Sequence, residues 1–327
     1  MLKKTLAVAT FATAALLANV AAAQEVVMYS GNNTASVDAV VAAISKKMPD
    51  LKVSVVGGKT GSLLQRIKAE SQNPQSDVFW SAGFATLGAF SDNFQPHTSA
   101  TTKALPASMI GPNGLWTGTN THVMVIMVNE RQLRGLPAPK TWSDLLDAKW
   151  KGKLVMGNPE KSSSTYAQVY GLYQTFGQKG LDALAKVVTN VNSTSQVYKS
   201  VAAGEFAVGI TMEYAAHAYV DGGQKEIKLV YPTEGTYLSP EGMGLIKGAK
   251  NAANAAKLMD FLASPELQEA VFRATFRRPV STKVDVTAIA GLPKMADIKI
   301  IELDQLKAAK DRSEVIAAWK KAKAAAK

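Results

Sequence analysis

The chain has 327 residues, a formal net charge of +11 at pH 7 and no cysteine. Its length suggests about two domains and is ample for a sizeable hydrophobic core. The lack of cysteine excludes thiol catalysis, thiolate metal sites and disulfides. The basic excess favours an anionic partner, although part of it lies in the alanine- and lysine-rich tail 307–327, which is typical of a solvated helix.

The first residues are typical of a secretion signal. Lys3 and Lys4 precede an apolar stretch, 6–17, which is too short to span a bilayer, and small alanines follow it. We expect cleavage after Ala23, and no cysteine stands near that point to carry a lipid. The sequence therefore predicts that 1–23 is a signal peptide and that the mature protein is periplasmic, has no lipid anchor and does not bind nucleic acid.

Strands and helices alternate in the first part of the mature chain. Apolar residues recur at helical spacing between short apolar strands, which predicts a parallel sheet with helices on both faces. The strands are expected at 25–29, 51–56 and 77–80, and the helices at 37–48 and 63–67.

A second α/β unit follows. The chain then re-enters the first unit near 242–246, and helices fill the remainder. In the second unit, strands are expected at 122–128, 153–156, 208–211 and 227–231, and helices at 141–146 and 166–176.

Three strands of the first unit end in small polar loops, 30–34, 57–62 and 81–83. Ligands bind beyond the carboxyl ends of such strands, and free N–H groups at helix starts favour negative charge. A nucleotide P-loop is excluded because Val53 replaces the glycine it needs, while a simple tight turn at 57–62 stays open. The predicted ligand contacts from these loops are Ser30, Asn32, Asn33, Lys59, Thr60, Ser62 and Ser81.

Five stretches in the right order resemble one family, although each is loosely patterned alone. The family is the type-II periplasmic solute-binding proteins of ABC importers, in the group that binds ferric ions, thiamine, phosphonates and sugar phosphates. The resemblance covers nearly the whole mature chain. The stretches are Val27-Met28-Tyr29-Ser30-Gly31, Asp77-Val78-Phe79-Trp80-Ser81, 141–153, 201–205 and 256–268.

The resemblance implies an α/β fold of two lobes, each a mostly parallel sheet flanked by helices. Two crossover strands join the lobes, and the ligand lies in the cleft between them. The implied lobes are 24–118 plus 239–282 and 119–238 plus 283–327. The implied protein is a monomer without enzymatic activity or cofactor, which hands its ligand to a membrane permease.

The ferric-ion members of the family hold iron with a histidine in the first loop, a glutamate after the third strand and two consecutive tyrosines. The corresponding residues here are Asn33, Ala82, Tyr214 and Ala215. A trivalent ion needs anionic oxygen donors, and only Tyr214 supplies one. Ferric iron transport therefore stands as the alternative function.

The organic-anion members fit the sequence better. The loop at 161–165 puts hydroxyls and backbone N–H groups at a helix start, suited to a phosphate, phosphonate or carboxylate, although a simple helix cap stays open. Glu213 could accept from sugar hydroxyls or pair with a ligand amine, and Tyr214 would line the cleft. We expect a phosphonate or phosphorylated sugar, with further contacts from Ser162, Ser163, Ser164, Thr165, Glu213 and Tyr214.

Other polar residues have ordinary interpretations. His97 and His122 are expected to be structural or exposed, and Glu213 and His217 form a surface pair. One of the two arginines at 277–278 reaches the ligand, or both are solvated. A third function, a periplasmic phosphoester hydrolase, needs a nucleophile beside a base or a metal cluster, and the sequence shows neither.

Overall fold

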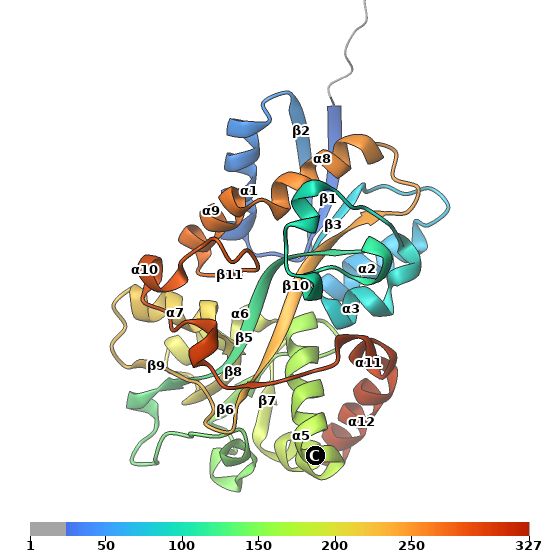
Figure 1. Cartoon of the computed structure of the whole chain (residues 1–327). Helices are drawn as coiled ribbons and strands as arrows, with labels where there is room; N and C mark the ends of the chain where they lie inside the picture. The colour runs from blue at the N-terminus through green and yellow to red at the C-terminus, as the bar shows by residue number, and fades with distance from the viewer. Residues whose placement is uncertain (1–23, 327) are drawn as a thin grey trace, which may run out of the picture.

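The computed structural model describes residues 24–326, so the predicted signal peptide lies outside the described residues. Figure 1 shows two lobes, one above the other, joined by two long strands, β5 (Thr117–Asn129) and β10 (Thr236–Ile246). The other strands are β1 (Gln24–Ser30), β2 (Leu51–Gly57), β3 (Val78–Gly83), β4 (Phe94–Gln95), β6 (Leu154–Met156), β7 (Val188–Asn190), β8 (Val208–Met212), β9 (Ile227–Val230), β11 (Arg278–Pro279) and β12 (Ile300–Ile301).

In the upper lobe, β1 pairs in parallel with β2 and β3, and Ser30 lies beside both Gly57 and Trp80. The three strands therefore end together, and the loops that follow meet at one edge. Alternate residues of β1 enter different cores, Met28 on one face and Tyr29 on the other. The helices of this lobe are α1 (Thr34–Lys47), α2 (Thr60–Ala69), α3 (Phe84–Ala89), α4 (Ala100–Lys103), α8 (Ala252–Ala263) and α9 (Pro265–Thr275).

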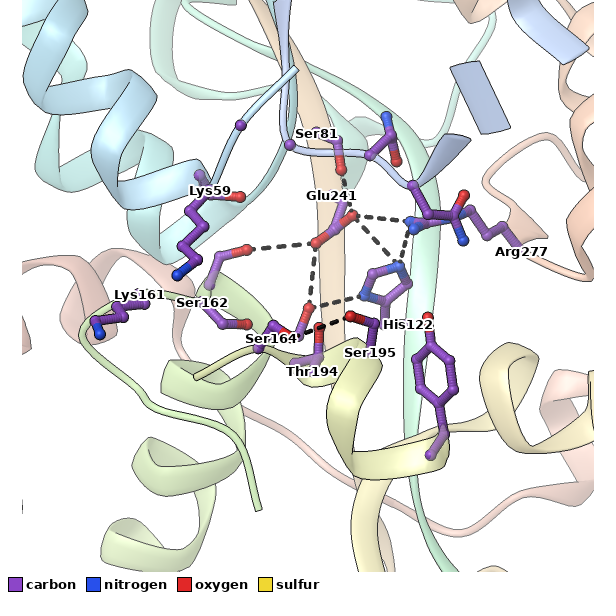
Figure 2. Close-up of a pocket in the computed structure, with 18 of the residues that line it drawn as sticks. Lys59, Ser81, His122, Lys161, Ser162, Ser164, Thr194, Ser195, Glu241 and Arg277 are labelled. Atoms are coloured by element: carbon purple, nitrogen blue, oxygen red, sulfur yellow. Dashed lines mark hydrogen bonds and ion pairs between the residues drawn. The ribbon is translucent and has the colours of Figure 1, made fainter. Parts of the chain in front are cut away.

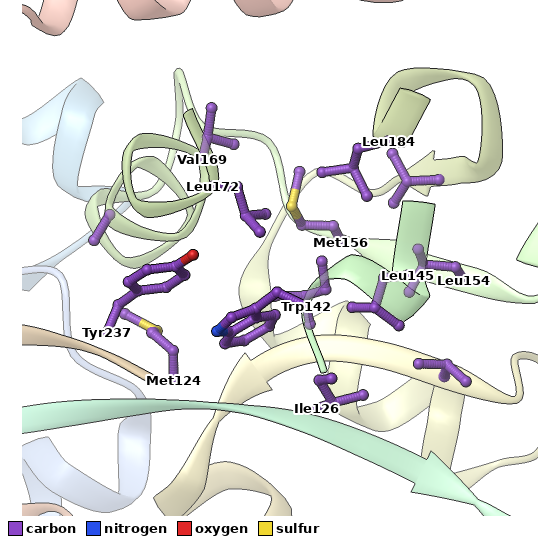
Figure 3. Close-up of a cluster of buried hydrophobic side chains, with 14 of the residues drawn as sticks. Met124, Ile126, Trp142, Leu145, Leu154, Met156, Val169, Leu172, Leu184 and Tyr237 are labelled. Atoms are coloured by element: carbon purple, nitrogen blue, oxygen red, sulfur yellow. The ribbon is translucent and has the colours of Figure 1, made fainter. Parts of the chain in front are cut away.

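The lower lobe repeats this arrangement, because β6 pairs in parallel with β7 and β8. Its core includes Trp142, which stacks on Tyr237 with ring centroids 5.3 Å apart (Figure 3). The predicted helix at 141–146 is a short 3₁₀ turn, and α5 departs from helical geometry at Gly177, where φ is 64°. The helices are α5 (Ser163–Val187), α6 (Thr194–Ala202) and α7 (Glu213–Asp221).

The strands β5 and β10 pair with each other and belong to both lobes. The first part of β5 pairs with β10 and β11, whereas 124–129 pairs with β8 and β9. Every residue of β5 is buried. The structure thus confirms two mostly parallel sheets joined by two crossover strands; the residue limits of the lobes stay a prediction.

The C-terminal helices lie along both lobes. They are α10 (Val286–Ala290), α11 (Gln305–Lys310) and α12 (Arg312–Ala325); α11 packs on α3 of the upper lobe and α12 on α5 of the lower lobe. The tail is therefore not simply solvated, because α12 buries Val315, Trp319 and Ala322. None of the helices within residues 24–326 has the length and apolar character needed to cross a membrane.

Candidate functional site

A cavity of about 210 Å³ lies between the lobes, where the strand ends of both sheets meet (Figure 2). We call it the interlobe cavity. Its lining is polar and comes from both lobes and from the crossover strands. It consists of Gly31, Asn32, Asn33, Gly58, Lys59, Thr60, Ser81, His122, 161–164, 192–195, Tyr198, Tyr214, Glu241 and Arg277.

Four helices begin at this cavity, two from each lobe: α1, α2, α5 and α6. Side chains cap three of them, since Asn33, Ser162 and Ser193 each accept one backbone N–H of the first turn, and α2 has no side-chain cap. The remaining N–H groups of each first turn have no partner within their helix. The helix starts therefore bring partial positive charge to one small volume.

The lobes approach closely at the start of α2. A Cβ atom added to Gly61 would lie only 3.0 Å from the carbonyl oxygen of Glu160 in the lower lobe. Any larger residue at this position would have to push the two backbones apart by a few tenths of an ångström.

The charged side chains that line the cavity are three cations and one carboxylate: Lys59, Lys161, Arg277 and Glu241. Lys161 Nζ donates to Asn192 Oδ1 over 2.9 Å. The ammonium group of Lys59 makes no hydrogen bond or ion pair with any residue in 24–326. The formal charges therefore add to the positive field of the helix starts.

Glu241, on β10, forms the floor of the cavity and is only 2% exposed. Its carboxylate accepts from Ser81 Oγ at 2.8 Å, from Arg277 Nη1 at 3.3 Å, and more weakly from Ser163 and Ser164. Burial alone would raise the pKa of Glu241, but His122, Arg277 and the Ser81 hydrogen bond together lower it. The carboxylate is ionised, and its oxygens are already well supplied with donors.

His122 and Arg277 complete the floor. Arg277 Nη1 donates to His122 Nε2 over 2.8 Å, and Nη2 donates to the Tyr214 hydroxyl over 3.0 Å. The proton of the neutral imidazole must then lie on Nδ1, which donates to Ser164 Oγ at 3.3 Å. Burial lowers the pKa of His122 to about 4; Glu241 opposes this shift and Arg277 adds to it.

This burial predicts a loss of stability in acid. Unfolded His122 takes up a proton near pH 6.5, and folded His122 resists it until about pH 4, so the free energy of unfolding should fall by about 3 kcal/mol over that interval. Urea unfolding of the wild type and of His122→Gln should show a difference that shrinks as the pH falls. A difference that stays constant would contradict a neutral buried imidazole.

The cavity gathers nine of the thirteen side chains predicted as ligand contacts. Their contact with a ligand stays a prediction, since the cavity shows only that they lie together. They are Asn32, Asn33, Lys59, Thr60, Ser81, Ser162, Ser163, Ser164 and Tyr214.

Three predicted residues point elsewhere. Ser30 is fully buried, and its Oγ accepts a backbone N–H of the following loop. Ser62 lies two positions after Thr60 on α2, about 200° around the helix, and lines a separate groove beside α12. Thr165 is buried against the backbone of Gly157 below the loop before α5.

Glu213 is also placed differently, because it forms a buried ion pair away from the cavity. Arg278 donates to it from Nε at 2.5 Å and from Nη2 at 2.9 Å, and the Tyr231 hydroxyl donates at 2.5 Å. The predicted surface pair with His217 is therefore wrong. Of the two adjacent arginines, Arg277 lines the cavity and Arg278 forms an ion pair with Glu213.

Several lining residues were missed from the sequence. The segment 192–195 follows a strand and starts a helix, and the Ser193–Gln196 capping box was a readable signal for it. His122, expected to be structural or exposed, is buried and lines the cavity. Glu241 had no local signal, because its partner Ser81 is 160 residues away.

Comparison with known proteins agrees with this architecture. A protein-family profile described as "Bacterial extracellular solute-binding protein" matches residues 73–309. "Iron uptake protein A1" of Synechocystis sp. is 28% identical over 292 residues, which are 83% of this chain and 77% of that protein. A "Putative 2-aminoethylphosphonate-binding periplasmic protein" of Salmonella typhimurium is 28% identical over 250 residues, 73% of this chain and 72% of that protein.

Solved structures share the fold. The periplasmic binding protein AfuA from Actinobacillus pleuropneumoniae, with exogenous fructose-6-phosphate bound, has a TM-score of 0.84 at 23% identity, covering 91% of this chain and 98% of that one. Iron-bound HitA from Pseudomonas aeruginosa has a TM-score of 0.81 at 20% identity, covering 91% and 99%. Since the family profile spans well over half of the sequence, this chain belongs to the bacterial extracellular solute-binding proteins.

Proposed function

We propose that this protein is the periplasmic substrate-binding component of an ABC importer and that it captures a small organic anion in the interlobe cavity. The anionic group is a phosphonate, phosphate or carboxylate. We also propose that residues 1–23 are removed on export and that the mature protein is a monomer without a lipid anchor.

One observation carries the proposal. Four helix starts, two from each lobe, converge on the cavity together with Lys59, Lys161 and Arg277. Within residues 24–326, Glu241 is the one carboxylate that lines the cavity, and it already accepts hydrogen bonds from several donors. Because the donors come from both lobes, a bound anion would hold the lobes together. The phosphonate and sugar phosphate in the names of two similar proteins are in keeping with this chemistry.

The donor set disfavours the ferric-iron alternative. Of the four positions that correspond to iron ligands in the family, only Tyr214 offers an anionic oxygen on ionisation. Burial raises the pKa of Tyr214, and the guanidinium of Arg277 lies directly against its hydroxyl, where it would repel a trivalent cation. Within residues 24–326 no group of three or more His, Asp and Glu side chains could hold a metal.

The hydrolase alternative also meets an obstacle in the geometry. Ser164 Oγ lies 3.3 Å from His122 Nδ1, and a carboxylate oxygen of Glu241 lies 3.3 Å from Nε2, an order that matches the nucleophile, base and orienting carboxylate of a hydrolase. However, Arg277 occupies the free lone pair on Nε2, so Nδ1 carries the proton and cannot accept one from Ser164. With a pKa of about 4, His122 is also a weak base. We therefore propose binding without turnover.

The proposal can be tested by thermal shift and calorimetry on the mature protein. The ligands are inorganic phosphate, methylphosphonate, glucose 6-phosphate, ferric citrate and spermidine. A true ligand at about 100 times its Kd should add about 2.7 kcal/mol to the free energy of unfolding. Stabilisation by spermidine alone, or a visible tyrosinate band with ferric citrate, would overturn the proposal.

Lys59→Met should weaken binding of the anion about fivefold, because it removes an unpaired cation from the cavity. The loss should shrink at high ionic strength, where exposed charges are screened. Lys46→Met removes the same charge at the exposed far end of α1 and serves as the control. If the two variants bound the anion with equal affinity, Lys59 would not contact the ligand.

A further inference from the structure

A second cavity, of about 220 Å³, adjoins the interlobe cavity. The two cavities share three residues, which form the wall between them. Among the described residues, 24–326, none that lines the second cavity carries a formal charge. We call it the aromatic chamber, and the residues that matter for its chemistry are Asn33, Tyr198, Tyr214, Ala218, Tyr219 and Phe276.

The chamber is walled by rings that stay uncharged. Tyr198 and Tyr219 have ring centroids 6.2 Å apart at an angle of 51°. Burial raises the pKa of both phenols, so neither ionises at physiological pH. Rings of this kind bind uncharged planar or alicyclic groups through apolar and edge contacts.

The backbone at Phe276 links the chamber to the anion site. Phe276 ends α9 in the left-handed region, with φ at 58°, which bulky residues rarely adopt. This turn puts Phe276 on the chamber and the next residue, Arg277, on the interlobe cavity. Two successive side chains thus contact the two adjoining volumes that one ligand could span.

The surroundings disfavour a positively charged group in the chamber. No carboxylate in the part of the chain that the structure describes lines it, and Glu213, next to Tyr214 in sequence, already receives hydrogen bonds from Arg278 and Tyr231. The guanidinium of Arg277 lies 4.4 Å from the ring centroid of Tyr214. An ammonium ion in the chamber would therefore lie near a ring that already carries a guanidinium, and would find no counter-charge among the lining residues.

From this geometry we propose that the ligand has two parts: an oxyanion at the helix starts and an uncharged, ring-shaped organic group in the aromatic chamber. This inference rests on the proposed function for its anionic end and adds the chemistry of the other end. It separates organophosphonates and organophosphates with a ring from aminoalkyl phosphonates, whose ammonium would have only ring contacts to hold it, with no carboxylate to balance its charge.

Isothermal titration calorimetry with three phosphonates tests the inference. At a pH where every phosphonate group is a dianion, phenylphosphonate should bind at least about tenfold more tightly than methylphosphonate, because the chamber removes the ring from water. 2-Aminoethylphosphonate should bind no more tightly than methylphosphonate. Equal affinity for the phenyl and methyl compounds, or tighter binding of the aminoethyl compound, would overturn the inference.

A filling substitution gives a second readout. Ala218 lies exposed on α7 and lines the chamber, so Ala218→Leu should fold and occupy part of the volume. It should remove the advantage of phenylphosphonate and leave methylphosphonate unchanged. Ala253→Leu, on the exposed face of α8, is the matched control.

The outcomes separate the two proposals. If Ala218→Leu lowered the affinity for both phosphonates equally, the chamber would not hold the phenyl ring and the inference would be wrong. The proposed anion site would still stand, because both phosphonates would still bind the wild type. If neither phosphonate nor inorganic phosphate binds the wild type, the proposed function itself fails, and the inference falls with it.

Discussion

Arg277→Met should lower the free energy of unfolding by about 3–5 kcal/mol and abolish anion binding. The guanidinium is 5% exposed and donates to Glu241, His122 and Tyr214 at once. Without it, the carboxylate of Glu241 stays buried with no cationic partner. Urea unfolding followed by tryptophan fluorescence, with calorimetry for the ligand, measures both effects.

A second substitution shows whether the unpaired charge is the cause. Adding Glu241→Gln to Arg277→Met removes that charge and should restore part of the lost stability, while ligand binding stays absent. Arg273→Met is the control, because Arg273 pairs with Glu269 on the surface of α9 and should contribute less than about 1 kcal/mol. An Arg277→Met protein as stable as the control would show that the floor does not depend on this ion pair.

Glu213→Gln should lower the free energy of unfolding by about 3 kcal/mol and leave anion affinity unchanged. Glu213 and Arg278 are 1% and 3% exposed, so the substitution leaves a buried guanidinium without its carboxylate. The amide keeps the shape of the side chain, so packing is disturbed little. Chemical unfolding and calorimetry of the same sample measure the two quantities.

The control for this variant is Glu269→Gln, which breaks an exposed ion pair on α9. It should be close to the wild type in both stability and binding. If Glu213→Gln were instead as stable as the wild type but did not bind the anion, Glu213 would be a ligand contact, as the sequence predicted.

The strand-end loops could be predicted because their signals are local. Each signal is an apolar strand that ends at small polar residues and is followed by a helical pattern, and it can be recognised within about ten residues. Parallel pairing of the strands then brings their ends together. In this way Asn32, Thr60 and Ser81 were assigned to one site, as were the three serines 162–164 at the start of α5, and all of them line the interlobe cavity.

The floor of the cavity could not be predicted in the same way. Glu241 and Arg277 reach their partners only through the pairing of β10 and β5 and the return of the chain after α9. Nothing within a few residues of Glu241 differs from an ordinary exposed charge, and for the arginines at 277–278 the sequence left open whether one reaches the ligand or both are solvated. Their role depends on contacts between segments that are far apart in the sequence.

Some residues that the sequence predicted as ligand contacts lie outside the cavity, for local reasons that a sequence pattern does not show. Ser62 belongs to the correct loop and helix start, but the helical rotation from Thr60 turns it to another groove. Glu213 is adjacent in sequence to the cavity residue Tyr214, but its carboxylate forms an ion pair with the buried Arg278 instead. Composition and spacing locate a segment, whereas the direction of each side chain depends on the helix geometry and on its partners.

The crossover strands have a kinetic consequence. His122 and Glu241 lie on β5 and β10, so a rotation of one lobe about these strands would move them little, whereas it would separate the start of α2 in one lobe from the start of α5 in the other. Ligand escape then requires the backbones to part where Gly61 meets Glu160. A larger residue at Gly61 should therefore shorten the residence time of the ligand far more than it slows arrival.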